Sequence, residues 1–158
     1  MKINKRLLFI CIAIPLIVGI TASLLTRNSM EIFAFVNKPP LAPPSGLFPI
    51  VWTILYILMG ISSYLIIVAD VNKTAKEKAL RLYTYQLLVN FLWPTFFFNF
   101  QWYFFSFVWL LLLWILVLLM ILQFKKIRPL AGYLNVPYFL WLTFAGYLNF
   151  LIWILNHK

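Results

Sequence analysis

Amide and aromatic side chains recur at helical spacing inside three long apolar stretches of the sequence. The members of each set are separated mostly by three or four positions: Gln86, Asn90, Trp93 and Phe97; Trp52, Tyr56 and Met59; Trp141, Ala145, Leu148 and Asn149. This spacing places the members of one set on one face of a helix. A cavity between such faces would have aromatic walls and a few amide groups, which suits a flat, apolar and polarisable ligand.

The amide side chains also have a purely structural interpretation. Asn and Gln in membrane-spanning helices often hydrogen-bond to neighbouring helices and hold a bundle together. They are functional candidates as well, because an unpaired polar group in lipid costs free energy. For Gln86 and Asn90 both interpretations stay open. Trp52, Trp93 and Trp141 lie farther along their segments than tryptophans that only anchor a helix at the membrane interface.

The composition indicates a membrane protein and argues against several classes of enzyme. Of the 158 residues, 65% are hydrophobic and 10% are charged, whereas soluble domains have about 25% charged residues. The single His157 and the single Cys11 predict no metal site and no disulfide framework within the chain. Three separated acids provide no carboxylate pair for glycosidase-type chemistry. The net charge of +10 comes from short basic clusters between apolar runs, which favours membrane topology over nucleic-acid binding.

Five apolar segments approach the length of about 20 residues that a membrane helix needs. We expect an all-α membrane protein, a single domain over residues 1–158, with helices at about 7–26, 47–71, 79–99, 103–124 and 135–156. Residues 27–46 form a connection, because its prolines cannot continue a helix. The first segment also resembles a signal peptide with a cleavage site at Thr21-Ala22-Ser23. Its length and the four later segments favour a retained helix.

The distribution of basic residues predicts the orientation of the chain in the membrane. Ten Lys and Arg residues fall in the N-terminal segment and in the second and fourth connections, and three fall on the alternate side. Basic connections stay in the cytoplasm. We therefore expect the N-terminus inside, the C-terminus outside and the proline-rich connection 27–46 on the outer face.

Three stretches of the chain resemble the signature of a known family. They are NKPPLAPPSGLFPIVWTILYILMGISSYL (37–65), QLLVNFLWPTFFF (86–98) and VPYFLWLTFAGYLNFLIWILN (136–156). By these motifs the chain resembles the bacterial members of the translocator protein family, also called tryptophan-rich sensory proteins or peripheral-type benzodiazepine receptors. The resemblance covers about residues 30–156, and the first helix matches in length and position only.

The resemblance implies a five-helix bundle, a homodimer and a ligand cavity that opens toward the first connection. Relatives bind porphyrins such as protoporphyrin IX and haem, isoquinoline-carboxamide and benzodiazepine-type drugs, and in animals cholesterol. Carried over by position, the ligand-binding residues would be Pro43, Pro44, Phe48, Trp52, Tyr56, Asn90, Trp93, Phe97, Tyr138, Trp141, Ala145 and Asn149. This set agrees with the faces obtained from helical spacing.

Two positions depart from the family pattern beside the implied cavity. Leu41 stands where many relatives have a tryptophan, and Pro94 stands where a polar residue is common. Pro94 is expected to bend the third helix, so drug affinity is in question. The proposed cholesterol pattern fails after Tyr147, because the next basic residue is Lys158. Cholesterol is therefore not favoured as a ligand.

We expect a binding or sensory protein for tetrapyrroles, porphyrin or haem, in a bacterial cytoplasmic membrane. Its partners would be this ligand or another hydrophobic small molecule, membrane lipid and a second copy of the chain, and it would require no cofactor. Arg27 or Lys38 would meet the ligand's carboxylates at the cavity mouth. Axial ligation of haem iron is disfavoured, since the spans hold no histidine and a tyrosine, Met59 or Cys11 would have to serve.

Three other functions stay open from the sequence. One is an enzyme that degrades porphyrin under light and oxygen, with Trp52 and Trp141 as redox-active groups. A second is a transporter of tetrapyrrole or lipid, although five helices without repeats and without an intramembrane charge relay argue against ion coupling. A third is a structural or partner-regulating subunit.

The charge distribution provides a test of orientation. In a Cys11→Ala background, Ser45→Cys is expected to react with an impermeant thiol reagent added to intact cells, whereas Thr74→Cys is not. After the cells are lysed, both variants should react, which controls for reagent access. Labelling of the Thr74→Cys variant alone in intact cells would invert the orientation.

Overall fold

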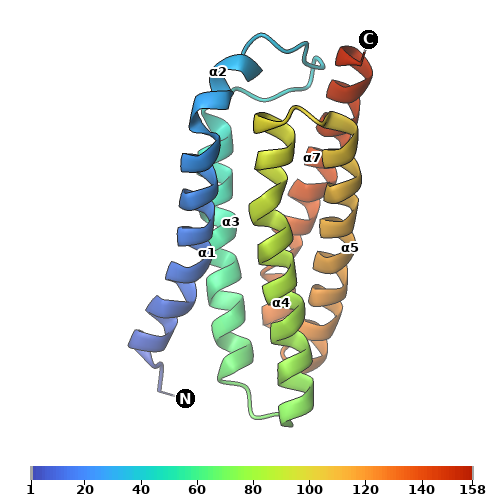
Figure 1. Ribbon diagram of the computed structural model, residues 1–158. Helices are drawn as coiled ribbons and strands as arrows, with labels where there is room; N and C mark the ends of the chain where they lie inside the picture. The colour runs from blue at the N-terminus through green and yellow to red at the C-terminus, as the bar shows by residue number, and fades with distance from the viewer. Residues whose placement is uncertain (1, 158) are drawn as a thin grey trace.

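The computed structural model describes residues 2–157, in which five long helices lie side by side in one bundle (Figure 1). The long helices are α1 (Lys5–Thr26), α3 (Leu47–Ile67), α4 (Lys73–Pro94), α5 (Tyr103–Ile127) and α7 (Val136–Asn156). The shorter elements are a 3-10 turn (Arg27–Ser29), α2 (Met30–Phe33), a π-helical turn (Thr95–Asn99) and α6 (Pro129–Tyr133). Residues 2–157 contain no strand, and the predicted all-α class is confirmed.

The largest difference from the expected helix bounds is at the start of α4. This helix begins at Lys73, six residues before the expected position 79. The Asn72 side chain caps it by accepting a hydrogen bond of 2.8 Å from the backbone N–H of Ala75. The charged segment 73–81 is therefore the first part of a helix and not a loop. Lys76 extends back to α3, where its Nζ donates to the carbonyl of Ile67 over 2.8 Å.

Four segments are long and apolar enough to cross a membrane: Lys5–Phe33, Leu47–Ile67, Tyr103–Ile127 and Pro129–Asn156. The helix α4 lacks this apolar character, because its first turns carry charged side chains such as Lys73 and Glu77, which form an ion pair of 3.6 Å. A fifth crossing by α4 stays a prediction, as does the orientation. Figure 1 shows the N-terminus and the α3–α4 connection at one end of the bundle, and α2 and the C-terminus at the other.

The bundle directs many large apolar side chains outward and encloses amide side chains. Phe9 is 73% exposed and Leu140 is 62% exposed, whereas Gln86 and Asn135 are 0% exposed. In a soluble protein large apolar side chains are mostly buried and amides are mostly exposed. The observed distribution fits a lipid environment, in which polar groups must be satisfied within the protein.

Two contacts close the end of the bundle that holds the N-terminus. Gly60 of α3 lies directly against the backbone of α1, and a Cβ at Gly60 would overlap the Cα of Ile12. On the other side of α3, Ser62 Oγ donates to the carbonyl of Ala131 over 2.7 Å and accepts from Asn135 Nδ2 over 2.6 Å. These contacts join α3 to α1 and to the α6–α7 corner, and the cavity described below lies in the opposite half.

Candidate ligand-binding cavity

A cavity of about 510 Å³ lies in the half of the bundle nearer α2, among α1, α3, α4, α5 and α7. This volume is within the range of about 300–1,000 Å³ for small-molecule sites. Leu16 and Thr26 both line the cavity and are ten residues apart on α1, so the cavity extends about 15 Å along that helix. Nine of the twelve predicted ligand-binding residues line it: Phe48, Trp52, Tyr56, Asn90, Trp93, Phe97, Trp141, Ala145 and Asn149. Ligand contact by these residues stays a prediction.

Three of the predicted residues do not line the cavity. Pro43 and Pro44 lie in the connection between α2 and α3, outside the lining. Tyr138 is 1% exposed and contacts Asn90 and not the open space. Its hydroxyl accepts a hydrogen bond from Asn90, which does line the cavity.

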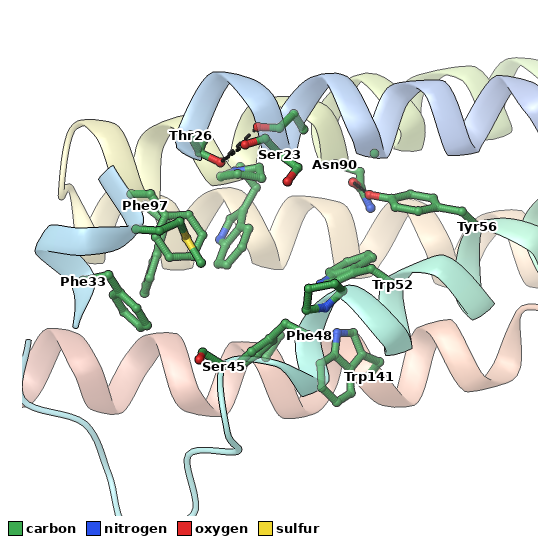
Figure 2. Close-up of a pocket in the computed structure, with 18 of the residues that line it drawn as sticks. Ser23, Thr26, Phe33, Ser45, Phe48, Trp52, Tyr56, Asn90, Phe97 and Trp141 are labelled. Carbon is green, nitrogen blue, oxygen red and sulfur yellow. Dashed lines mark hydrogen bonds between the residues drawn. The ribbon is translucent and has the colours of Figure 1, made fainter. Parts of the chain in front are cut away.

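Aromatic rings form much of the cavity wall. The ring pairs, with the distances between their centroids, are Phe48–Trp141 (5.8 Å), Trp52–Tyr56 (5.5 Å), Trp93–Phe97 (5.0 Å) and Phe33–Phe97 (5.5 Å). Figure 2 shows Phe48, Trp52 and Trp141 grouped on one side of the cavity, with Phe33 and Phe97 toward the α2 end. Such walls offer flat, polarisable faces on which a planar ligand can stack.

A chain of hydrogen bonds crosses the deep end of the cavity and connects α3, α4 and α7. Tyr56 donates its hydroxyl to Asn90 Oδ1 over 2.9 Å, and Asn90 Nδ2 donates to the Tyr138 hydroxyl over 2.7 Å. The Tyr138 hydroxyl in turn donates to Gln86 Oε1 over 2.9 Å. Gln86 does not line the cavity, and its Nε2 donates to Met59 Sδ over 3.8 Å. Gln86 therefore holds helices together, and Asn90 has this function too although it also borders the cavity.

A second set of hydrogen bonds surrounds Asn149 near the other end. Its Oδ1 accepts from the indole N–H of Trp93 over 3.1 Å and from Ser106 Oγ over 3.2 Å. Its Nδ2 donates to the carbonyl of Tyr103 over 2.8 Å. Both polar atoms of the Asn149 amide thus have protein partners, and Trp93 lines the cavity with its N–H already paired.

The indole N–H groups of Trp52 and Trp141 differ from those of the other internal tryptophans. The N–H groups of Trp93, Trp109 and Trp114 each donate to a protein oxygen. Trp52 and Trp141 line the cavity, half-buried, and within residues 2–157 their N–H groups have no protein acceptor. Two hydrogen-bond donors are therefore available to a molecule in the cavity.

The position of Phe97 depends on the irregular end of α4. Pro94 has no N–H to continue the α-helical hydrogen bonding, and a π-helical turn over Thr95–Asn99 follows it. The backbone N–H of Phe100 donates to the carbonyl of Thr95 over 3.1 Å, which closes this turn. The bend expected at Pro94 stays a prediction, but α-helical hydrogen bonding ends there. Phe97 lies within the turn that follows, lines the cavity and is 3% exposed.

The sequence interpretation missed the contribution of α1 and α2 to the cavity. Lining residues on these elements include Gly19, Ser23, Thr26 and Phe33. A Cβ on Gly19 would overlap the ring of Tyr56, so this glycine admits the ring between the helices. A signal was present, because the small residues at 19, 22, 23 and 26 recur at a spacing that places them on one helix face.

Few of the side chains that were expected to meet a ligand's carboxylates or to ligate haem iron border the cavity. Arg27 lines it and Lys38 does not. The Lys38 Nζ lies 4.6 Å from the centre of the Phe33 ring and 3.4 Å from the carbonyl oxygen of Ala34. Cys11 and Met59 are buried and do not line the cavity. Of the three possible iron ligands considered from the sequence, only a tyrosine, Tyr56, lines it.

The connection between α2 and α3 is attached to the end of α7. The Asn37 N–H donates to Asn156 Oδ1 over 3.1 Å, and Asn156 Nδ2 donates to the Asn37 carbonyl over 2.8 Å. At the opposite side of the mouth, Ser29 Oγ donates to Asn99 Oδ1 over 2.6 Å, and Asn99 Nδ2 donates to the Leu25 carbonyl over 3.1 Å. Both attachments hold the outer rim of the cavity in place.

Comparison with known proteins identifies relatives along nearly the whole chain. A family model described as the TspO/MBR family matches residues 11–154. The tryptophan-rich protein TspO of Chlorobaculum tepidum is 36% identical over 156 residues, which is 97% of this chain and 99% of that protein. The human translocator protein is 36% identical over 126 residues, 79% of this chain and 75% of that protein. The tryptophan-rich sensory protein of Cereibacter sphaeroides is 33% identical over 115 residues, 73% of this chain and 70% of that protein.

The hydrogen bonds of Asn90 generate a stability prediction. Asn90→Ala leaves the Tyr56 hydroxyl without its acceptor and removes one donor from the Tyr138 hydroxyl, which still donates to Gln86. A buried hydroxyl left without a partner costs about 1–3 kcal/mol. We expect a lower melting temperature in detergent, measured by circular dichroism. The matched control is Asn28→Ala at an exposed position, where no change is expected. Equal melting temperatures for both variants would contradict the structural role of Asn90.

Proposed function

Because this chain belongs to the TspO/MBR family, we propose that it is a membrane protein that binds tetrapyrroles in the cavity between its helices. The chain is an integral membrane protein, since several of its helices are long and apolar enough to cross a bilayer and its relatives cover nearly all of its length. The observation that carries the proposal is the aromatic wall of the cavity, with the indole N–H groups of Trp52 and Trp141, which have no acceptor within residues 2–157.

The chemistry of the cavity matches a flat ligand with an apolar face and hydrogen-bond acceptors. The amides at the deep end and around Asn149 already have protein partners. The donors that stay available include the indole N–H groups of Trp52 and Trp141, beside the rings on which a planar ligand would stack. A porphyrin or haem combines a large aromatic face with acceptor groups at its edge. Isoquinoline-carboxamide and benzodiazepine-type molecules share this combination on a smaller scale.

The names of the relatives support a role in sensing or in transport of a ligand more than a role in catalysis. One relative is named a tryptophan-rich sensory protein and another a translocator protein. We propose a binding and sensory role in a bacterial cytoplasmic membrane, by a homodimer of five-span subunits. Transport of a tetrapyrrole or lipid is the alternative that the second name suggests.

Fluorescence quenching tests ligand binding directly. Protoporphyrin IX added to the detergent-solubilised protein is expected to quench tryptophan fluorescence saturably. Trp52→Phe and Trp141→Phe each remove one N–H donor and keep most of the ring packing. Each should weaken binding about fivefold, because a typical hydrogen bond contributes about 1 kcal/mol.

The control for this test is Trp153→Phe, because Trp153 lies at the end of α7 and does not line the cavity. Its affinity for protoporphyrin IX should equal that of the parent protein. Quenching that rises linearly without saturation would refute binding in the cavity, and equal weakening in all three variants would refute the role of the two indoles.

A second candidate function is the degradation of porphyrin under light and oxygen. The observation that favours it is the placement of two indole rings on the cavity wall, with Trp52 stacked on Tyr56 at 5.5 Å. An indole donates an electron more readily than a phenyl ring does, so a bound and excited porphyrin would have donors beside it.

Illumination separates a photo-enzyme from a binding protein. If the second function holds, porphyrin absorbance decays in light and oxygen, is stable in the dark, and decays more slowly in Trp52→Phe and Trp141→Phe. Relative to the parent, the double variant should lose less of its affinity for porphyrin than of its rate of porphyrin decay. Decay in the parent at the rate of free porphyrin in detergent would leave a binding protein only, as would equal decay in the double variant.

A further inference from the structure

We infer that the cavity selects ligands that carry a carboxylate, and that it holds this carboxylate at the α2 end against the guanidinium of Arg27. The inference rests on the proposed function, because it concerns the same cavity. It adds the charge class of the ligand and the direction in which the ligand lies. An amphiphilic ligand would insert its apolar part toward Tyr56 and Asn90 and leave its acidic edge at the mouth.

The charge on the cavity lining is concentrated in one residue. Arg27 is the single charged residue among those that line the cavity, and no acidic residue lines it. Residues 2–157 contain a single ion pair, which joins Lys73 to Glu77 at the opposite end of the bundle from Arg27. Glu31 follows Arg27 by four positions but makes no ion pair with it, and its side chain is exposed. The guanidinium is thus available to an anion from outside the protein.

Two hydroxyl groups add to this polar end of the cavity. Ser23 and Ser45 both line it, and Figure 2 shows them among the side chains around the open space. Thr26, next to Arg27 in the chain, donates its hydroxyl to the carbonyl of Ala22 over 3.0 Å. Its oxygen can therefore only accept a hydrogen bond, whereas the two serines can donate one. A carboxylate accepts up to four hydrogen bonds and suits such a group of donors.

The deep end of the cavity offers a carboxylate no comparable partner. Tyr56 donates its hydroxyl to Asn90, and Asn90 donates one of its two N–H groups to Tyr138, so few donors stay available at this end and no charged residue lines it. A carboxylate moved from water to this end would lose its hydration without an opposite charge, which is strongly unfavourable. The direction of an acidic ligand follows from this difference between the two ends.

Lys38 provides a matched comparison for Arg27. Both residues are basic, exposed and at the α2 end of the bundle. Lys38 does not line the cavity, and its Nζ contacts the Phe33 ring and the Ala34 carbonyl. Removing either charge changes the net charge of the protein equally, so a difference between the two variants reports the position of the charge.

The experiment compares protoporphyrin IX with its dimethyl ester, which has the same ring system and no ionised carboxylate. The affinity of each is measured by fluorescence quenching in the parent protein and in Arg27→Gln, Arg27→Lys and Lys38→Gln. The parent should bind the diacid about fivefold more tightly than the diester, the upper range for an exposed ion pair. The preference should fall as salt is raised.

The variants should divide according to the position of the charge. Arg27→Gln should remove the preference and leave the affinity for the diester unchanged, which also shows that the cavity is intact. Arg27→Lys should retain part of the preference, because the charge stays and the paired donors of the guanidinium are lost. Lys38→Gln should retain the full preference.

Several outcomes would overturn the inference. A preference that survives in Arg27→Gln, or that disappears equally in Lys38→Gln, would show that Arg27 does not hold the carboxylate. Equal affinities for diacid and diester in the parent would show that the cavity does not select a carboxylate. If neither porphyrin quenches saturably in the parent, the proposed function itself fails, and this result is distinct from the others.

Discussion

Polar groups between lipid-facing helices must find their partners inside the bundle, because lipid tails offer none. This constraint determines the interior of the protein. Asn90 bonds to Tyr56 and Tyr138, and Asn149 bonds to Trp93 and to the carbonyl of Tyr103. The bonds join α4 to α3 and α7, and they join α7 to α5. The amides therefore determine the relative positions of the helices that surround the cavity.

The same constraint distinguishes groups that support the fold from groups that are available to a ligand. Amides that look suitable for ligand binding in the sequence are occupied by protein partners in the bundle. The indole N–H groups of Trp52 and Trp141 and the guanidinium of Arg27 have no such partners within residues 2–157, although all three residues line the cavity. The two half-buried indoles gain a hydrogen bond from an incoming molecule, since an unmade hydrogen bond in a dry site is costly. The exposed guanidinium of Arg27 offers an ion pair instead.

The cavity also depends on two irregular features of otherwise regular helices. Gly19 has no side chain where the Tyr56 ring enters, so α1 and α3 approach each other closely. Pro94 ends the α-helical part of α4, and the π-helical turn after it directs Phe97 toward the open space. One feature lets an aromatic ring fill the space between two helices at the deep end. The other places a ring at the end nearer α2, and the open volume lies between them.

The all-α class and the shared face of Asn90, Trp93 and Phe97 could be predicted from the sequence, because helical periodicity and apolar length are local properties. The start of α4 was misplaced, since the cap by Asn72 outweighs the charge of the turns that follow. Only the tertiary structure decided that Tyr138 contacts Asn90 and not the cavity, and that Arg27 borders the opening while Lys38 contacts Phe33. The share of α1 in the cavity was indicated only by the small residues at 19, 22, 23 and 26, because the helix is otherwise apolar on nearly every side. A helix without a distinct polar face gives little indication of its rotation about its own axis, and that rotation is set by the neighbours against which it packs.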